Sequence, residues 1–111
     1  MDDAALAAAV KMVPFSAHLG FEIKEMGPER VVVHAVIRPE FCTSGGTAHG
    51  GFLMALADFT GAVAAFQVLP EGAKGTTTIE SKTNMMGPSR LEPRWWPPQR
   101  RCMLAGAPAC G

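Results

Sequence analysis

The spacing of apolar residues in the first part of the chain predicts a short helix followed by two strands. Residues 2–13 combine strong helix formers with an aspartate at either of the first two positions as N-cap, and Pro14 marks the end of this helix. Over residues 21–26 apolar and charged side chains alternate, and residues 31–38 are rich in β-branched side chains. Residues 27–29 (GPE) form a turn signal, so the two strands are expected to pair as a hairpin.

A twenty-residue apolar stretch at 50–69 (GGFLMALADFTGAVAAFQVL) predicts a long helix that begins near His49 and ends before Pro70. This helix is apolar on nearly every face, so we expect other elements to wrap it. Residues 39–48 are expected to form a loop, and residues 75–86 return to the threonines and isoleucine typical of a strand. The order of helix, strand, strand, long buried helix and strand predicts an α+β fold.

The same stretch is long enough to cross a membrane, which needs about 20 predominantly apolar residues. Asp58 in its middle argues against this, because an aspartate at the bilayer centre costs about 2.5–3.5 kcal/mol on insertion scales. Neither end carries a cluster of Lys or Arg that would set an orientation. We therefore expect the buried helix of a soluble domain and no membrane contact.

Residues 91–111 (LEPRWWPPQRRCMLAGAPACG) do not continue this pattern. They hold both tryptophans and four of the nine prolines but no Val, Ile or Thr, and the prolines argue against a central strand. We expect one domain over residues 1–90 and an atypical tail over 91–111. Two interpretations of the tail stay open: a mobile proline-rich segment, or a frameshifted one, because Trp, Pro, Arg, Cys, Ala and Gly are what GC-rich codons yield out of frame.

Composition narrows the class of protein. A chain of 111 residues supports one domain, and its 10 basic and 10 acidic side chains argue against a nucleic-acid binder. This overall charge balance hides a difference between two parts of the chain. Residues 1–90 carry 7 basic and 9 acidic groups, whereas residues 91–111 carry 3 basic groups and 1 acidic group. Three cysteines and an acidic start do not suggest a secreted disulfide scaffold, so a cytoplasmic protein is expected.

The candidate chemistry lies at the start and in the middle of the long helix. The run His49-Gly50-Gly51 begins the helix, where backbone N–H groups without intrahelical partners can bind an oxyanion and glycines let a ligand approach. Asp58 is an acid in an apolar helix, and burial of a charge at such a place is typical of a general base with a raised pKa. Structural alternatives stay open: close packing of the glycines on a strand, and for Asp58 a role as the cap of a loop or pairing with Lys82 or Arg90.

The spacing within the helix adds a prediction about assembly. Gly50 and Asp58 are eight residues apart, which is about 12 Å along a helix axis. The two groups of one chain cannot easily reach the same substrate atom. Two antiparallel copies of the helix, related by a two-fold axis, would place Gly50 of one chain beside Asp58 of the other, so a homodimer with composite sites is expected.

These motifs together resemble the hotdog-fold acyl-CoA thioesterases, specifically the group named for phenylacetate degradation. The resemblance runs from about residue 14 to residue 90. It rests on Pro14-Phe15, His18-Leu19-Gly20, the hairpin, GTAHGG at 46–51, and LAD at 56–58 with Gly61 after it. It implies a long central helix wrapped by a curved antiparallel sheet, in subunits that pair as dimers or dimers of dimers with active sites at the interface. The family's sheet has two further strands after the Gly-Pro at 87–88, which residues 91–111 are not expected to supply.

The resemblance also implies a function: hydrolysis of an acyl-CoA thioester to a free acid and CoA, with no cofactor and no metal. The Gly50 N–H would bind the thioester carbonyl, and Asp58 of the partner chain would activate water or attack directly. His49 would shape the helix start and the acyl site. A hydroxyl on the next strand would assist the carboxylate; Thr78 fits this position, with Thr76 or Thr77 as alternatives.

Two further positions complete the expected site, and two other functions stay open. Thr43 stands where the family often has an asparagine that supports the carbonyl, and Arg90 or Lys82 could meet the CoA phosphates. The chain could instead be a non-catalytic hotdog that binds acyl-CoA or a partner, or an inactive form that lacks its last strands and leaves the long helix partly uncovered. The spacing of His18, His34 and Cys42 is not typical of a metal site.

Overall fold

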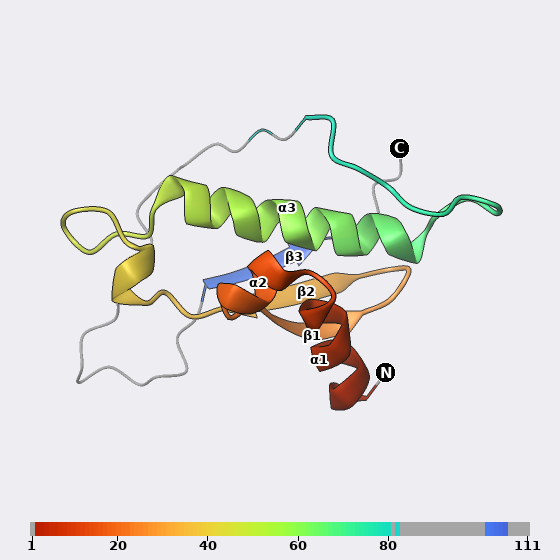
Figure 1. The fold of residues 1–111 in the computed structure, drawn as a ribbon, viewed down its shortest axis with the longest axis horizontal. Coiled ribbons are helices and arrows are strands. Elements are labelled where there is room, and N and C mark those ends of the chain that lie inside the picture. Colours follow the sequence, from red (N-terminus) through yellow and green to blue (C-terminus); the bar gives the residue numbers. More distant parts are fainter. Residues whose placement is uncertain (1, 81, 83–101, 107–111) are drawn as a thin grey trace.

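In the computed structural model, which describes residues 2–80, 82 and 102–106, a long helix lies across one face of a three-stranded antiparallel sheet (Figure 1). The strand order is β1-β2-β3, and two short helices precede the sheet. The elements are α1 (Asp3–Lys11), α2 (Pro14–His18), β1 (Glu22–Met26), β2 (Val31–Ala35), a 3-10 turn (Pro39–Phe41), α3 (Gly50–Gln67) and β3 (Cys102–Gly106). The predicted α+β class is confirmed, and a long helix against an antiparallel sheet is compatible with a hotdog-like fold.

The first predicted helix is confirmed as α1. The Asp2 carboxylate caps it by accepting a hydrogen bond from the Ala5 N–H at 2.8 Å. Leu6 and Val10, one turn apart, are buried where α1 packs on β1. Pro14 ends the pattern as predicted, but it also begins α2, which the sequence did not predict; the fixed φ of proline suits the first position of a helix.

The predicted hairpin is confirmed as β1 and β2. Ile23 lies opposite Val33 and Met26 opposite Val31, with a bulge between Ile23 and Glu25, and the Gly27 N–H closes the turn on the Arg30 carbonyl at 3.0 Å. The β2 strand ends at Ala35, earlier than the predicted residue 38. Its valines are buried on both faces, which explains why this strand reads as a continuous apolar run.

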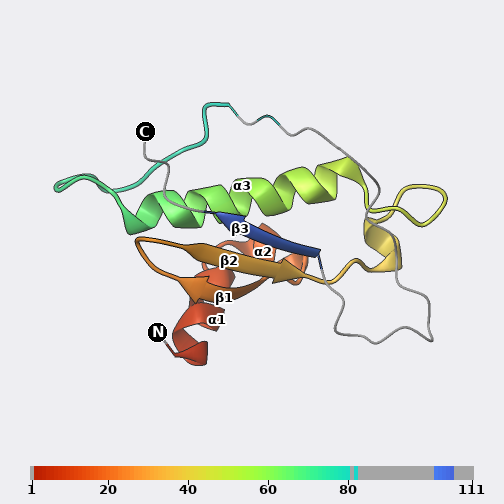
Figure 2. The same ribbon diagram turned by 180° about the vertical axis from the view of Figure 1, so that it is seen from behind.

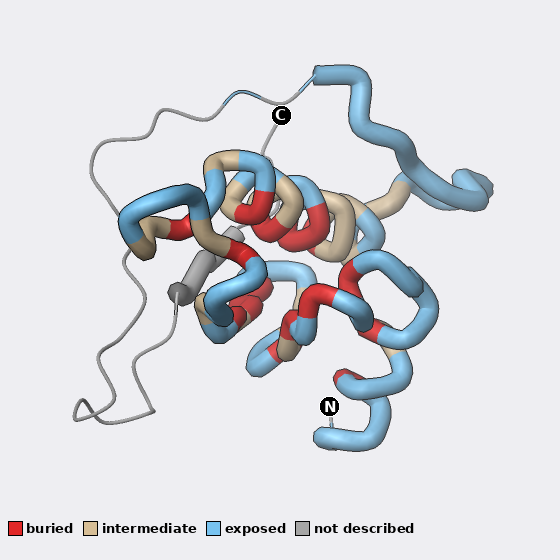
Figure 3. The backbone as a smooth tube through the Cα atoms, turned by 60° about the vertical axis from the view of Figure 1, so that its left-hand side comes forward, coloured by how far each residue is buried: buried red, intermediate tan, exposed pale blue. Residues whose placement is uncertain are grey.

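The long helix is confirmed as α3, but the prediction that other elements wrap it is wrong for the described residues. One stripe of the helix is buried against β2 and β3, with Leu56 only 1% exposed at its centre. On the other side Met54 is 43% exposed and Phe66 51%, and Figure 3 shows the burial confined to the face toward the sheet. Three strands of five residues each are too narrow to curve around a helix of eighteen.

The buried side of α3 also bears on the possibility that this helix crosses a membrane. By length and composition, α3 is apolar enough to cross a membrane. Its central residues nevertheless pack in the same cluster as the strands, and the buried Thr60 hydroxyl donates to the Leu56 carbonyl at 2.7 Å. One side of α3 therefore packs on the sheet, and the other side is exposed in this chain.

Aromatic rings fix the start of α3 on the sheet. Phe52 stacks on Phe41 with ring centroids 4.7 Å apart, and Phe21 lies 5.8 Å from Phe52 and 5.7 Å from Phe59. The Arg38 guanidinium covers the other side of this cluster, 4.4 Å from the centroid of Phe41. The segment before α3 is therefore held to the core by side chains that flank the candidate site.

The predicted strand over 75–86 is wrong for the part that the structure describes. Residues 75–80 run along the side of α3 that faces away from the sheet and form no ladder, as Figures 1 and 2 show. Ile79 is 96% exposed. β-Branched residues stabilise a strand only where a neighbouring strand pairs with them, and β3 occupies the edge of β2. Residues 83–86 lie outside the described residues.

The tail contains a strand where none was expected. Cys102–Gly106 pairs with β2 in antiparallel register, with Val31 opposite Gly106 and Ala35 opposite Cys102. This stretch is the proline-free interval between Pro98 and Pro108, and within the described sheet it is an edge strand, the position that neighbouring prolines permit. The domain boundary at residue 90 and the frameshift remain predictions.

Candidate functional site

The first turn of α3 is organised by His49. This residue is the N-cap: its ring Nδ1 accepts a hydrogen bond from the Gly51 N–H at 2.8 Å, and its carbonyl accepts from the N–H of Phe52 at 3.0 Å. Its own N–H donates to the Phe41 carbonyl at 2.7 Å. Among the described residues the Gly50 N–H has no partner, so Gly50 supplies the free donor at the positive end of the helix dipole.

The loop before the helix is held by its own hydrogen bonds. Thr43 donates its N–H to the Thr47 carbonyl at 2.8 Å, and its hydroxyl lies 3.0 Å from the Ser44 carbonyl and 3.1 Å from the Thr47 hydroxyl. Gly45 and Gly46 have φ values of 92° and 78°, a left-handed turn that favours glycine. Thr43, a predicted substrate contact, is thus placed as a residue that closes this loop.

Asp58 lies two turns further along α3, and the prediction that it is buried is wrong. The residue is exposed in this chain, because the helix buries only the stripe that faces the sheet. The desolvation cost that marked it as a candidate base therefore does not arise within one chain. The predicted alternative of pairing with Lys82 is not seen either: within the described part of the chain, Asp58 forms no ion pair.

The partner of Asp58 is a hydroxyl from the segment after the helix. Thr78 Oγ1 donates to Asp58 Oδ1 at 2.7 Å. The resemblance to the thioesterases implied Thr78, with Thr76 or Thr77 as alternatives, and the structure brings Thr78 to the carboxylate although the expected strand is not formed. Its role in chemistry remains a prediction.

Asp58 and Thr78 open onto a groove of about 740 Å³ between α3 and the segment 76–80. The helix side of the groove is made mostly of small residues at successive turns: Ala57, Gly61, Ala62 and Ala65. A Cβ built on Gly61 would meet nothing within 4 Å. The groove therefore leaves space for a ligand directly beside the carboxylate.

The structure thus assembles two halves of the predicted site and keeps them apart. His49, Gly50 and Gly51 meet at the start of α3, and Asp58 meets Thr78. The two groups remain about 12 Å apart along one helix, as the sequence spacing requires. Arg90 lies outside the described residues, and within the described ranges no three His, Cys, Asp or Glu side chains cluster as a metal site would require.

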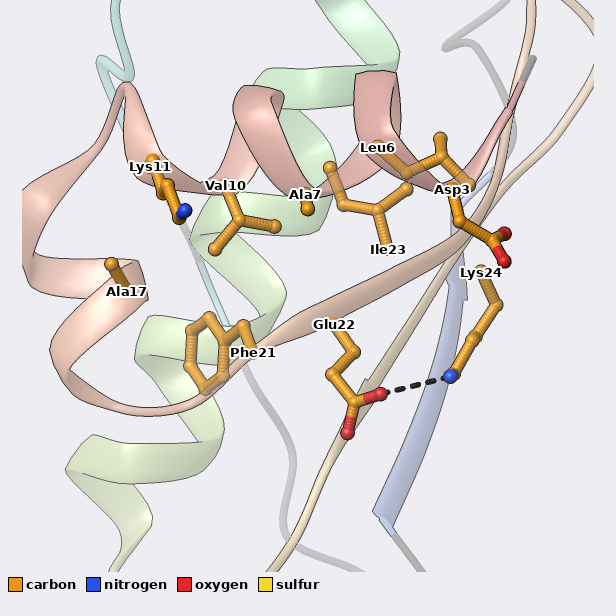
Figure 4. Close-up of a pocket in the computed structure, with 10 residues that line it drawn as sticks. All are labelled: Asp3, Leu6, Ala7, Val10, Lys11, Ala17, Phe21, Glu22, Ile23 and Lys24. Atoms are coloured by element: carbon orange, nitrogen blue, oxygen red, sulfur yellow. Dashed lines mark hydrogen bonds and ion pairs between the residues drawn. The ribbon is translucent and has the colours of Figure 1, made fainter.

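A second groove, of about 470 Å³, lies between α1 and β1 and was not predicted (Figure 4). Leu6, Val10 and Ile23 form its apolar floor, and Lys24 pairs with Glu22 at 2.8 Å on its rim. The apolar face of α1 and the alternation in β1 were visible in the sequence, but nothing there indicated that the two would leave a gap. None of the candidate site residues lies in this groove.

Two curated proteins of Mycobacterium tuberculosis are similar to this chain: "Putative esterase MT1895" of strain CDC 1551 / Oshkosh and "Putative esterase Rv1847" of strain ATCC 25618 / H37Rv. Each is 29% identical over 72 residues, which is 65% of this chain and 51% of the relative, so the chain spans about half the length of the curated relatives it matches. The crystal structure of S. sahachiroi AziG is similar with a TM-score of 0.47 and 28% identity, over 49% of this chain and 43% of that chain. No family model matches the sequence.

Proposed function

We propose that this chain is a hotdog-fold hydrolase that cleaves an acyl-CoA thioester to a free acid and CoA. The observation that carries the proposal is the hydrogen bond from Thr78 to Asp58 at the mouth of an open groove, which holds a carboxylate ready for a substrate. The similarity to two proteins named as esterases supports the broader class of hydrolase. Acyl-CoA as the substrate rests on the resemblance of the helix motifs to the thioesterases.

In the proposed reaction, Asp58 acts as the general base. Thr78 donates to Oδ1 and so fixes the rotation of the carboxylate, and the second oxygen is left to accept a proton from water. The water oxygen attacks the thioester carbon, and the C–S bond then breaks. The thiolate of CoA leaves and takes up the proton, and the acyl group leaves as the acid.

The Gly50 N–H is the proposed donor for the carbonyl oxygen, which becomes an oxyanion in the transition state. Its support is that this N–H has no partner among the described residues and lies at the start of an eighteen-residue helix. His49 and Gly51 shape this turn, and Thr43 and Arg90 are proposed contacts of the substrate.

The donor and the base are proposed to come from different chains of a homodimer, since about 12 Å of helix separates them within one chain and they cannot easily reach the same substrate atom. The proposed location of this homodimer is the cytoplasm. In an antiparallel pair, Gly50 of one protomer would face the partner's Asp58. The exposed outer face of α3 supports this, because it carries Asp58 together with the half-exposed Met54. Neither nucleic acid nor a membrane is a proposed partner.

The test is thiol release from a panel of acyl-CoA thioesters by the full chain and by Asp58→Asn. We expect the substitution to abolish most turnover while ligand binding is retained. Glu71→Gln is the matched control, because Glu71 is also an exposed acid near α3 but does not line the groove. Thiol release that survives Asp58→Asn undiminished would remove Asp58 from its role.

A second candidate function is non-catalytic binding of acyl-CoA, and the exposure of Asp58 favours it, since one chain does not hold this carboxylate in a site that excludes water. A pure binder would show no turnover in the parent chain and unchanged binding in Asp58→Asn. Measurements of thiol release and binding on the parent chain and on Asp58→Asn therefore distinguish the two functions.

A further inference from the structure

We propose that His49 is a positioning residue whose ring and the missing side chain of Gly51 form one device, which reserves the Gly50 N–H for a ligand. Only the expected effect on activity rests on the proposed function. The structural part concerns the first turn of α3 and does not depend on it.

The hydrogen bond sets the state of the ring. His49 Nδ1 accepts from the Gly51 N–H at 2.8 Å, so Nδ1 carries no proton and the neutral ring carries its hydrogen on Nε2. The ring thereby satisfies the second N–H of the helix. The first, that of Gly50, lies between this bonded donor and the His49 N–H, which is bonded to Phe41 at 2.7 Å.

The ring occupies the space that a side chain on residue 51 would need. A Cβ built on Gly51 would lie 2.9 Å from His49 Nδ1 and 3.1 Å from its Cε1, closer than side chains pack. The ring and a Cβ at position 51 therefore exclude each other, and any residue other than glycine would push the ring off its hydrogen bond. Glycine at this position is explained by the cap, beside any need for a ligand to approach.

The device is anchored to the core rather than to the loop alone. The Phe41 carbonyl that holds the His49 N–H belongs to a residue whose ring stacks on Phe52, in the first turn of the same helix, at 4.7 Å. Arg38 covers Phe41 and donates to the His18 carbonyl at 3.2 Å. Loss of the cap should therefore loosen the first turn locally and leave the rest of the fold in place.

The first experiment measures Tm of the full chain with Gly51→Ala, His49→Ala and both together. We expect Gly51→Ala to lower Tm by several degrees when His49 is present, because the cap is displaced, and to raise Tm slightly in the His49→Ala background, because alanine favours a helix. Gly61→Ala is the matched control in α3: its Cβ meets nothing, so it should raise Tm in both backgrounds. A Gly51→Ala effect of the same sign and size in both backgrounds would overturn the inference.

A second measurement reads the ring directly. In ¹⁵N NMR spectra recorded at a pH where the ring is neutral, His49 of the parent chain should carry its hydrogen on Nε2 almost exclusively, and Gly51→Ala should shift the ratio of tautomers toward that of a free histidine side chain. A His49 ring that carries its hydrogen on Nδ1 in the parent would overturn the inference.

The activity experiment separates positioning from direct catalysis. His49→Ala should lower kcat for thiol release about tenfold or more with little change in KM, because the oxyanion donor acts in the transition state. His49→Asn should restore Tm and bring kcat to within about threefold of the parent, since asparagine is among the preferred N-caps. An Asn variant with restored Tm that is as slow as His49→Ala would overturn the positioning role.

The failures are distinguishable. If the parent chain releases no thiol, the proposed function fails. The inference is then decided by two measurements alone: whether the effect of Gly51→Ala on Tm changes sign between the two backgrounds, and which tautomer the His49 ring adopts. If the parent hydrolyses thioesters and His49→Ala keeps full kcat, the inference fails and the proposed function stands.

Discussion

Thr78 lies twenty residues after Asp58 in the chain and donates its hydroxyl to Asp58 Oδ1 at 2.7 Å. The bond joins the middle of α3 to the segment that runs back along the side of the helix away from the sheet (Figure 1). Both residues are exposed, and a groove of about 740 Å³ opens beside them. The pair therefore orients a carboxylate at the surface, where a substrate can reach it.

Removal of this hydroxyl should slow the proposed reaction. We expect Thr78→Val to lower kcat for thiol release about five- to tenfold, because a hydrogen bond to a charged group in an exposed site is worth about 1 kcal/mol or somewhat more. Thr78→Ser, which keeps the hydroxyl, should stay within about twofold of the parent. Thr76→Val and Thr77→Val are the matched controls; steady-state rates in which either is slower than Thr78→Val would assign the role to another threonine.

The path of the water oxygen distinguishes the two roles open to Asp58. If Asp58 acts as a base, a single turnover in H₂¹⁸O should place ¹⁸O in the product acid and none in the protein, because water attacks the thioester directly. If Asp58 attacks as a nucleophile, it forms an anhydride with the acyl group as CoA leaves, and water that attacks the Asp58 carbonyl carbon of this anhydride leaves the label in that carboxylate. Mass spectrometry of the peptide that contains Asp58 makes the measurement, with Asp58→Asn as the blank.

The sequence correctly predicted those parts of the fold that depend on interactions between residues close together in the chain. The aspartate cap of α1, the hairpin turn at Gly27 and the start of α3 at His49 all follow from residues close together in the chain, and the structure contains each. Thr78 as the hydroxyl beside Asp58 came instead from the resemblance to the thioesterases, which left Thr76 and Thr77 as alternatives, and the structure brings Thr78 to the carboxylate.

The errors concern which elements meet across long distances. Residues 75–80 have the β-branched composition of a strand, yet in this structure Cys102–Gly106 pairs with β2. Composition does not report the competition between two segments for one sheet edge. The burial of Asp58 was misjudged for the same reason, since an apolar helix is buried only as far as the sheet beneath it extends.

Filling the groove at Gly61 should change substrate preference without loss of stability. The helix position is open, so Gly61→Leu replaces a poor helix former by a good one and should raise stability by about 0.8 kcal/mol at most. The added side chain enters the groove beside Asp58, so kcat/KM for long or aromatic acyl groups should fall about tenfold more than kcat/KM for acetyl-CoA. The comparison is steady-state kinetics on both substrates together with Tm. An equal loss for large and small acyl groups would place the acyl site elsewhere.

The Gly50 N–H can be removed without removal of the helix. Proline lacks this hydrogen and is favoured at the first position of a helix, and His49 already has φ −63° and ψ 136°, the extended conformation that a residue before proline requires. We expect Gly50→Pro to keep Tm within a few degrees and to lower kcat about 10²–10³-fold, the cost of one lost oxyanion donor. Gly50→Ala, which retains the N–H, is the control and should lower kcat far less than Gly50→Pro.

The same variant tests whether each site is shared between two chains. A mixture of Gly50→Pro and Asp58→Asn chains, refolded together in equal amounts, contains about half mixed dimers by random pairing. In each mixed dimer one site combines the intact Gly50 of one protomer with the intact Asp58 of the other, and the second site lacks both. Thiol release should therefore recover to about one quarter of the parent rate, although each variant alone is nearly inactive. If both groups of one site came from the same chain, no mixed dimer would hold a complete site, and the mixture would stay as inactive as its components.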